Sequence, residues 1–289
     1  MKNLIMLVST LFFQANLSAQ TNSAINIVHK KIKTNLGEIA VQMRIVDDKP
    51  PILFLHGIYF DHHLWDYQIE NLTNRSTITI DMPLHGASKS AVSKDWTLED
   101  CSTMVIELLD ALNLPKVIAI GHSWGAMTIL RAAATHPERF QSIGFCNMPF
   151  KEATTKVKSK FRFQHMMVGL RKFYTKEVAK VMFGKDAPSK HPEWLDYLRT
   201  AMGKLTNKEV RWTEELAIIN AKDASLKITA LKVPAIALKG RTDYVGNPPN
   251  LKLTVVDGGH VSPLVAPQEV LDFVHEVMLL STETETPSL

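Results

Sequence analysis

The chain has 289 residues, of which 45% are hydrophobic and 21% are charged. These proportions are those of an ordinary globular protein, and they exclude wholesale disorder, a collagen-like repeat and a long coiled coil. The net charge of +4 is too small by itself to indicate nucleic-acid binding, and we expect no nucleic-acid partner. Two cysteines, Cys101 and Cys146, are too few for a disulfide framework or a cysteine-rich zinc site, and their spacing does not decide whether they pair.

The first residues have the order of a secretory signal peptide. Lys2 is followed by an apolar run from Leu4 to Phe13 and then by a polar stretch that includes Ala19. We expect residues 1–19 to be removed and the mature protein to be exported to the periplasm or secreted. Ten apolar residues are about half of what a membrane-spanning helix needs, so we expect no stable membrane insertion.

Apolar runs and helical patterns then alternate along the chain. Two strands are expected at Ile25–Lys33 and Ile39–Val46, joined by a turn. The later runs are apolar throughout, as is typical of strands buried on both faces of a parallel sheet: Pro51–Leu55, Thr77–Ile80, Val117–Ile120, Ser142–Phe145, Pro234–Leu238 and Leu251–Val256. Helical patterns lie between and after them, at His62–Leu72, Leu98–Leu112, Gly125–His136 and Pro267–Leu280. This order predicts an α/β fold with a doubly wound sheet, formed by residues 25–149 and 231–280 and followed by a frayed tail at 281–289.

Residues 150–230 interrupt this alternation with helices alone. Helical stretches are expected around Lys156–Lys172, Thr175–Phe183, Glu193–Ala201 and Glu209–Lys222, with a turn at Gly184–Pro192. We expect this insertion to form a helical cap over a site at the strand ends. Its segment 151–190 carries 11 basic residues against 3 acidic ones, which indicates either a solvated face or attraction of anionic substrates or of a negatively charged envelope surface.

The strongest motif is Gly121-His-Ser-Trp-Gly125, which lies directly between an expected strand and an expected helix. A G-x-S-x-G sequence in that context is a nucleophile elbow, because its glycines allow a turn too tight for side chains. Ser123 is therefore the predicted nucleophile. The start of the following helix favours negative charge that develops nearby.

A serine hydroxyl needs a base, and the base in turn needs a group that orients it. His260 follows the last expected strand, and Asp243 follows the strand before it, so both should lie at the same sheet edge as Ser123. The order Ser123, Asp243, His260 is that of α/β-hydrolase triads. The alternative acid position after Phe145 holds Asn147-Met-Pro and offers no carboxylate.

Acyl transfer also needs donors for an oxyanion. We expect these to be the backbone N–H groups of Trp124, which follows the nucleophile, and of Ile58 in the His56-Gly-Ile58 motif. His56 is expected to brace this loop, and it is included with Trp124, Phe161, Met166 and Met167 among candidate pocket residues. Asp61-His62-His63 lacks metal-ligand spacing, so we expect a helix start capped by Asp61 and no metal or organic cofactor.

These motifs resemble those of the α/β-hydrolase fold family, in the branch that has a serine nucleophile and a helical cap. The resemblance runs from about Ile25 to Leu280 and includes Asp81-Met-Pro-Leu-His-Gly-Ala-Ser88, which is similar to a family segment with glycine where Leu84 stands. Trp65 and the stretch His136–Phe140 also match. The resemblance implies an eight-stranded sheet of order 1-2-4-3-5-6-7-8, an antiparallel second strand and a cap after the sixth strand. The serine argues against the epoxide hydrolase and haloalkane dehalogenase branches, which use aspartate.

The sequence therefore predicts a serine hydrolase that cleaves a small, largely apolar carboxylic ester or lactone through an acyl-enzyme. C–C bond hydrolysis, haloperoxidase-like activity and proline-type aminopeptidase activity use the same triad and remain open. From another class of function, a hydrolase-fold protein that binds a small ligand with little turnover is the alternative. The sequence does not decide the substrate or the oligomeric state.

Overall fold

The computed structural model describes residues 27–283, except for 91, 93 and 94. The expected signal peptide at 1–19 and the end of the expected tail lie outside these residues. The first described strand pair is β1 (Ile27–Thr34) and β2 (Gly37–Arg44), joined by a tight turn.

Eight strands form one continuous sheet. Their order is β1-β2-β4-β3-β6-β7-β8-β9, and a two-residue strand, β5 (Lys89–Ser90), pairs with the first two residues of β2. The remaining strands are β3 (Ile52–Leu55), β4 (Thr77–Ile80), β6 (Val117–His122), β7 (Phe140–Cys146), β8 (Ala235–Gly240) and β9 (Lys252–Val256). β2 runs antiparallel to β1 and β4, whereas the pairs from β4 to β9 are parallel. The predicted fold class and strand order are confirmed; only β5 was not expected, because two residues carry no strand pattern.

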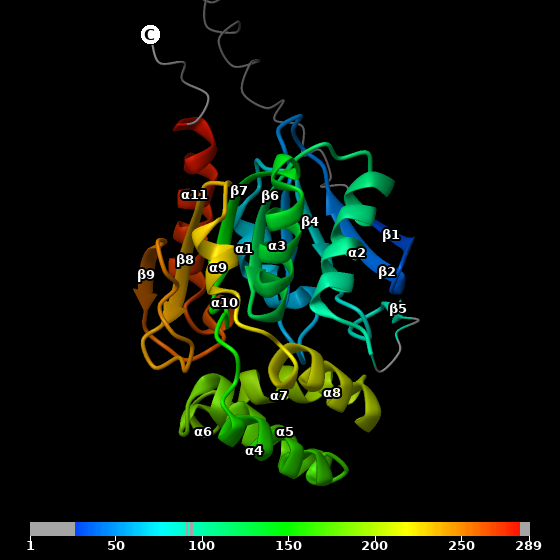
Figure 1. The fold of residues 1–289 in the computed structure, drawn as a ribbon, viewed down its shortest axis with the longest axis vertical. Helices are drawn as coiled ribbons and strands as arrows, with labels where there is room; N and C mark the ends of the chain where they lie inside the picture. Colours follow the sequence, from blue (N-terminus) through cyan, green and yellow to red (C-terminus); the bar gives the residue numbers. More distant parts are fainter. Residues whose placement is uncertain (1–26, 91, 93–94, 284–289) are drawn as a thin grey trace, which may run out of the picture.

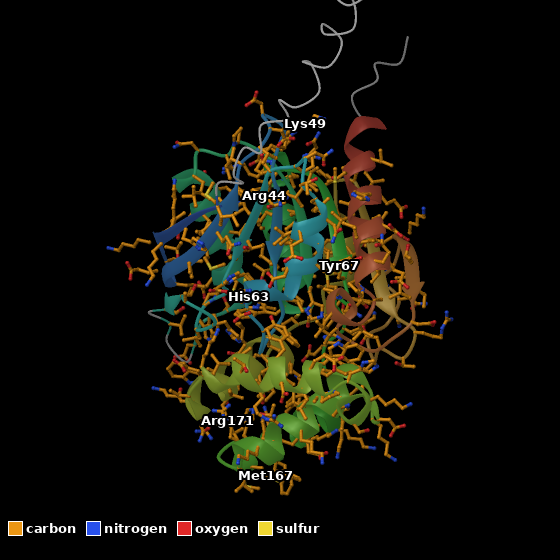
Figure 2. The ribbon with its side chains drawn as sticks, turned by 180° about the vertical axis from the view of Figure 1, so that it is seen from behind. Arg44, Lys49, His63, Tyr67, Met167 and Arg171 are labelled. Atoms are coloured by element: carbon orange, nitrogen blue, oxygen red, sulfur yellow. The ribbon has the colours of Figure 1, made fainter. Side chains whose placement is uncertain are left out.

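Helices cover both faces of the sheet. α2 (Leu98–Ala111) and α3 (Trp124–Thr135) pack together on one face, and α1 (Asp66–Asn71) and α11 (Pro267–Glu283) lie on the other (Figures 1 and 2). β3, β4 and β6 are buried at every position, which explains why their sequences are apolar throughout. α11 extends to Glu283, so the first residues of the expected frayed tail are helical.

All elements between β7 and β8 are helical. They are α4 (Thr155–Gln164), η3 (His165–Met167), α5 (Arg171–Phe183), α6 (Ala187–Lys190), α7 (Pro192–Gly203), α8 (Asn207–Glu214), the π-turn η4 (Glu215–Ile219) and α9 (Ser225–Thr229). Those from α4 to α8 lie beyond the carboxyl ends of the strands, and the last, α9, packs against α3 (Figure 1). The single helix expected at Lys156–Lys172 is wrong, because the chain turns between η3 and α5. The expected turn at Gly184–Pro192 contains α6. We call residues 150–230 the cap segment.

Smaller features complete the fold. Asp61 caps the 3-10 turn η1 (His62–Trp65) as expected, by accepting a hydrogen bond from the His63 N–H. Asp61 itself is buried, whereas the side chain of His63 is exposed. α10 (Ser262–Val265) connects β9 to α11. Cys101 and Cys146 are both buried free thiols. Within the described residues, no helix combines the length and apolar character that crossing a bilayer requires.

Gly125 is required by the packing of α3 on the sheet, which gives a testable consequence. A Cβ atom at this position would lie 2.4 Å from the Leu55 carbonyl oxygen, a backbone atom that cannot move aside. We predict that Gly125→Ala lowers the free energy of unfolding by about 3 kcal/mol, as expected for overpacking. The matched control is Gly203→Ala at the end of α7, where a Cβ meets nothing within 4 Å. Urea denaturation should show a change within about 0.5 kcal/mol for the control, and equal effects of the two substitutions would contradict this account.

Candidate active site

Ser123 occupies a sharp turn between β6 and α3. Its backbone has φ 50° and ψ −112°, a left-handed conformation that L-residues avoid, and its N–H donates to the Cys146 carbonyl oxygen at 2.9 Å. The side chain is nearly buried, with 6% of the residue exposed. A strained residue held by its neighbours at the end of a strand is typical of a functional position.

The structure brings Ser123, His260 and Asp243 together in one hydrogen-bonded line. The Ser123 Oγ donates to His260 Nε2 at 2.9 Å, and His260 Nδ1 donates to Asp243 Oδ1 at 2.9 Å. The three residues follow β6, β9 and β8, whose carboxyl ends meet at one edge of the parallel sheet. This arrangement can deprotonate the serine hydroxyl.

Asp243 is held as a carboxylate. Burial alone would raise the pKa of this group, but hydrogen bonds from His260, Asn147 and the Val245 N–H leave the pKa below its ordinary value. Asn147 Nδ2 donates to Asp243 Oδ2 at 2.7 Å. The ionised carboxylate fixes the proton of His260 on Nδ1, and Nε2 is left free to accept a proton. Asn147 stands at the alternative acid position after Phe145, and there it stabilises the Asp243 carboxylate by this hydrogen bond.

The backbone of His260 is also held by hydrogen bonds at its N–H and at its carbonyl oxygen. Its N–H donates to the Met182 carbonyl oxygen of the cap segment at 2.8 Å, and its carbonyl oxygen accepts from His122 Nε2 at 2.8 Å. Burial lowers the pKa of the His122 imidazole to about 3, and the neighbouring His260 ring adds to the effect. His122 is therefore a neutral brace beside the nucleophile.

Two backbone N–H groups are available next to Ser123. A Cβ at Gly57 would lie 3.1 Å from the Ser123 Cβ and 2.5 Å from His122 Nδ1, so the loop backbone passes directly against the nucleophile only because residue 57 is glycine. Among the described residues, the N–H groups of Ile58 and Trp124 have no hydrogen-bond acceptor. Free donors beside a serine can stabilise an oxyanion.

Two buried histidines brace the loop that carries Ile58. His56 Nδ1 donates to the Gly57 carbonyl oxygen at 2.7 Å, and its Nε2 accepts from the Met82 N–H at 2.8 Å. The N–H of Tyr59, a residue at φ 73°, donates to His85 Nε2 at 3.1 Å. Leu84 has a φ of 71°, a conformation that favours glycine. This explains the glycine at the corresponding position of the family segment that the sequence resembles. His56 therefore supports the loop.

The cap segment holds the same loop through two buried carboxylates. Glu214 of α8 is fully buried and accepts hydrogen bonds from the hydroxyls of Tyr59 and Tyr174, both at 2.6 Å, and from His165 Nε2 at 2.8 Å. Asp61 accepts from the hydroxyl of Tyr197 at 3.0 Å and from Lys204 Nζ at 2.9 Å, which lie in and just after α7. Neither contact could be predicted from the sequence, because the partners are over 130 positions apart.

Tyr244 is a site residue that the sequence analysis missed. Its ring stacks on the imidazole of His260 with 4.5 Å between centroids, and its hydroxyl lies 3.1 Å from His260 Nε2. Its position directly after Asp243 was the one available signal.

The candidate pocket residues divide into two groups. Trp124 is buried beneath the site, where its ring packs against His85 and Trp96. Phe161 lies on α4, and Met166 and Met167 lie on η3; Met166 is 72% exposed. Figure 2 shows Met167 at the end of the cap segment farthest from the sheet. Besides Tyr244, a chain of aromatic side chains leads toward the site: Trp194 packs on Phe183, Phe183 on Phe60, and Phe60 on the His122 ring.

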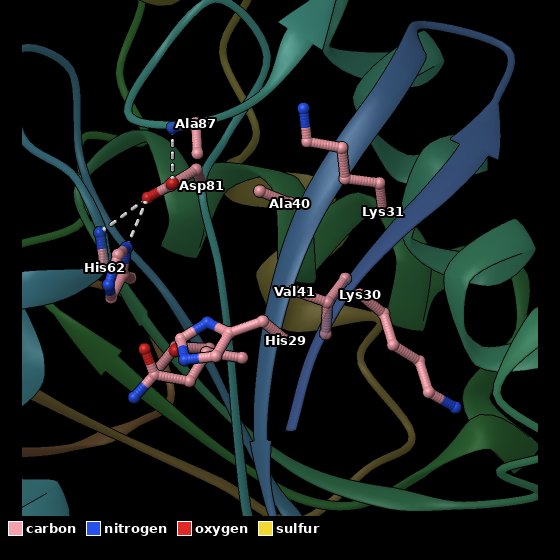
Figure 3. Close-up of a pocket in the computed structure, with 10 residues that line it drawn as sticks. His29, Lys30, Lys31, Ala40, Val41, His62, Asp81 and Ala87 are labelled. Carbon is pink, nitrogen blue, oxygen red and sulfur yellow. Dashed lines mark hydrogen bonds and ion pairs between the residues drawn. The ribbon is translucent and has the colours of Figure 1, made fainter. Parts of the chain in front are cut away.

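A separate cavity of about 190 Å³ lies beside β1, β2 and β4, and none of the three triad residues lines it (Figure 3). On its wall, Asp81 accepts hydrogen bonds from the side chain and N–H of His62 and from the Ala87 N–H. Burial alone would raise the pKa of Asp81, but these bonds hold it well below its ordinary range. Through these hydrogen bonds, the Asp81 carboxylate fixes the conformation of the loop that contains His85. The described residues contain no group of three or more metal-ligating side chains suited to a metal ion.

The low pKa of His122 predicts a pH-dependent contribution to stability. In the unfolded chain, this histidine takes up a proton as the pH falls below about 6.5, whereas the folded protein does not until about pH 3. The contribution of His122 to the free energy of unfolding therefore falls by about 2 kcal/mol when the pH is lowered from 7.5 to 5.0. We predict that His122→Gln, measured by urea unfolding at both pH values, loses about 2 kcal/mol less than the unsubstituted protein over that interval. An unchanged pH dependence would contradict the burial of a neutral imidazole.

The contact between Tyr59 and Glu214 predicts a stability effect. Tyr59→Phe removes one donor from a buried carboxylate, and we expect the free energy of unfolding to fall by about 2 kcal/mol. The control is Tyr67→Phe, which removes a hydrogen bond to Gln268 at the surface and should cost less than about 0.5 kcal/mol. In a double-mutant cycle, Tyr59→Phe should cost less when Glu214 is already Gln. A Tyr59→Phe effect no larger than that of Tyr67→Phe would show that the contact contributes nothing.

Comparisons with solved structures show what this architecture resembles. An esterase from Thermogutta terrifontis superposes with a TM-score of 0.75 at 22% identity, covering 88% of this chain and 99% of that chain. The enol-lactonase from Burkholderia xenovorans superposes with a TM-score of 0.76 at 19% identity, covering 86% of this chain and all of the other. At such identities, the likeness establishes the fold.

Sequence comparison places the chain among known hydrolases. It is 31% identical over 129 residues to 3-oxoadipate enol-lactonase 1 of Acinetobacter baylyi, and 29% identical over 104 residues to an epoxide hydrolase of Caballeronia sordidicola. These alignments cover 44% and 35% of this chain, and 46% and 32% of the relatives, so the chain spans less than half the length of either. Residues 50–267, well over half of the chain, match the family defined by the alpha/beta hydrolase fold. The chain therefore belongs to the alpha/beta hydrolase fold family.

Proposed function

We propose that the protein hydrolyses a small, largely apolar carboxylic ester or lactone, with Ser123 as nucleophile. The observation that carries this proposal is the line of two 2.9 Å hydrogen bonds from Ser123 through His260 to Asp243. A serine activated in this way attacks a carbonyl carbon, and the two free N–H groups beside it suit the oxyanion that results. An epoxide ring has no carbonyl oxygen for these donors to stabilise.

The reaction proceeds in two halves. His260 Nε2 takes the proton of Ser123 as the oxygen attacks, and the N–H groups of Ile58 and Trp124 stabilise the tetrahedral oxyanion. Asp243 stabilises the imidazolium, which then gives its proton to the leaving alkoxide. Water enters, His260 takes a proton from it, and the hydroxide attacks the acyl carbonyl; the bond to Ser123 Oγ then breaks, His260 returns the proton to Ser123, and the acyl group leaves as a carboxylic acid. In a lactone, the leaving alkoxide belongs to the same molecule as the acyl group.

Tyr244 lies beside the nitrogen that has to protonate the leaving group. Its hydroxyl lies within 3.1 Å of the same nitrogen that must protonate the leaving oxygen, so substrate and hydrolytic water compete with it for His260 Nε2. More than half of the surface of Tyr244 is exposed to solvent.

The substrate class follows from the surroundings and from the relatives. Phe60 packs against Phe183 and Tyr197 of the cap segment, and its ring lies 6.1 Å from that of His122. These aromatic groups suit an apolar acyl or alkyl group. Similar proteins include an enol-lactonase and an esterase, which favours esters and lactones over peptides. We propose that the reaction takes place in the periplasm or outside the cell, because residues 1–19 have the order of a secretory signal peptide.

The test uses the mature protein with p-nitrophenyl butyrate, a small enol-lactone and a fluorophosphonate label. We expect turnover of at least one substrate and covalent labelling of Ser123. Ser123→Ala should abolish labelling and lower turnover by about 10⁴-fold or more, and Asp243→Asn should lower kcat by roughly 10⁴-fold. The control Ser142→Ala, which changes a buried serine bonded to the Val277 carbonyl oxygen, should keep both activities.

Two results would contradict the proposal. Turnover retained in Ser123→Ala would place the nucleophile elsewhere. Retention of a small ligand without labelling or turnover would identify a binding protein that has kept the hydrolase fold.

A further inference from the structure

The helix α4 buries little of its surface against the rest of the protein. None of its ten residues is buried. A helix of this length is marginally stable by itself in water, and a helix in a folded protein normally draws its stability from a buried face. α4 and α5 lie on the far side of α7 and α8 from the sheet, at the outer end of the molecule (Figure 1).

α4 and the residues that follow it expose large apolar side chains. Six of the 14 large hydrophobic residues exposed in the described part of the chain fall between positions 157 and 181. Phe163 is 60% exposed and Leu170 is 64% exposed, and Met166 and Phe173 are exposed beside them in sequence. Single exposed apolar residues are common, but a concentration of them marks an interaction site.

The same segment is strongly basic. Residues 155–176 contain seven lysines and arginines and no aspartate or glutamate. Lys158 pairs with Glu152, and Arg171 donates to Leu205 and Asn207. The other five have no acidic partner among the described residues: Lys156, Lys160, Arg162, Lys172 and Lys176. We call these five cations, together with Val157, Phe163, Met166, Leu170 and Phe173, the cap tip.

We propose that the cap tip binds peripherally to the surface of an anionic lipid bilayer. Unpaired cations attract anionic headgroups, at roughly fivefold in affinity for each lysine or arginine near the surface. Phenylalanine and leucine among such cations are suited to the boundary between headgroups and acyl chains, where α4 gains the apolar contact that it lacks in the protein. A soluble polyanion would use the cations and leave the apolar side chains in water. The proposal is independent of the substrate.

The test is flotation of the mature protein with unilamellar vesicles of phosphatidylglycerol and phosphatidylcholine, compared with vesicles of phosphatidylcholine alone. We expect binding to the anionic vesicles that weakens as salt is raised. Lys160→Gln with Arg162→Gln should weaken binding about 25-fold. Phe163→Ser with Leu170→Ser should weaken it at least about tenfold. Turnover of a short ester in solution should remain unchanged in both variants, which shows that they are folded.

The matched control is Leu226→Ser with Lys227→Gln on α9, which changes one apolar residue that is 83% exposed and one cation away from the cap tip. It should bind vesicles as the unsubstituted protein does. Three results would overturn the proposal: no binding to anionic vesicles, equal loss in the control, or salt-sensitive binding that persists without Phe163 and Leu170. The last result would identify a site for a soluble polyanion.

Discussion

The strained turn at Ser123 is the constraint on which the site depends. The serine can hold a left-handed backbone only because β6 and α3 fix it on both sides, and α3 approaches the sheet closely enough only because residue 125 is glycine. That turn lifts the hydroxyl above the strand ends, where β8 and β9 deliver Asp243 and His260. The chemistry is thus a product of the parallel sheet, since antiparallel neighbours would send these loops to opposite edges.

The cap segment does more than cover this edge. It holds the loop of Ile58 through Glu214 and Asp61, and it holds His260 through the Met182 carbonyl oxygen. The oxyanion donors and the base are therefore positioned from the cap as well as from the core. Movement of the cap would alter the geometry of both, so access of substrate and alignment of the site are physically coupled.

The parts of the structure that could be predicted from sequence are those with a local cause. β3, β4 and β6 are apolar because they are buried on both faces, and Ser123 is recognisable because two glycines flank it between a strand and a helix. The exposure of Met166 was not predictable, because apolar residues scattered among basic ones do not reveal which side chains face the core. The contacts of Glu214 and Tyr244 depend on how the cap segment and the last loops fold back, which no local pattern encodes.

The account makes one claim that a single experiment can address directly: carbonyl chemistry takes place between Ser123, His260 and the two backbone N–H groups. The measurement is a crystal structure of the protein after reaction with a fluorophosphonate. We predict phosphorus bonded to the Ser123 Oγ and a phosphonyl oxygen within about 3 Å of both the Ile58 and the Trp124 nitrogen atoms, with His260 still paired to Asp243. A phosphonyl oxygen that points into solvent, or an adduct on another residue, would contradict it.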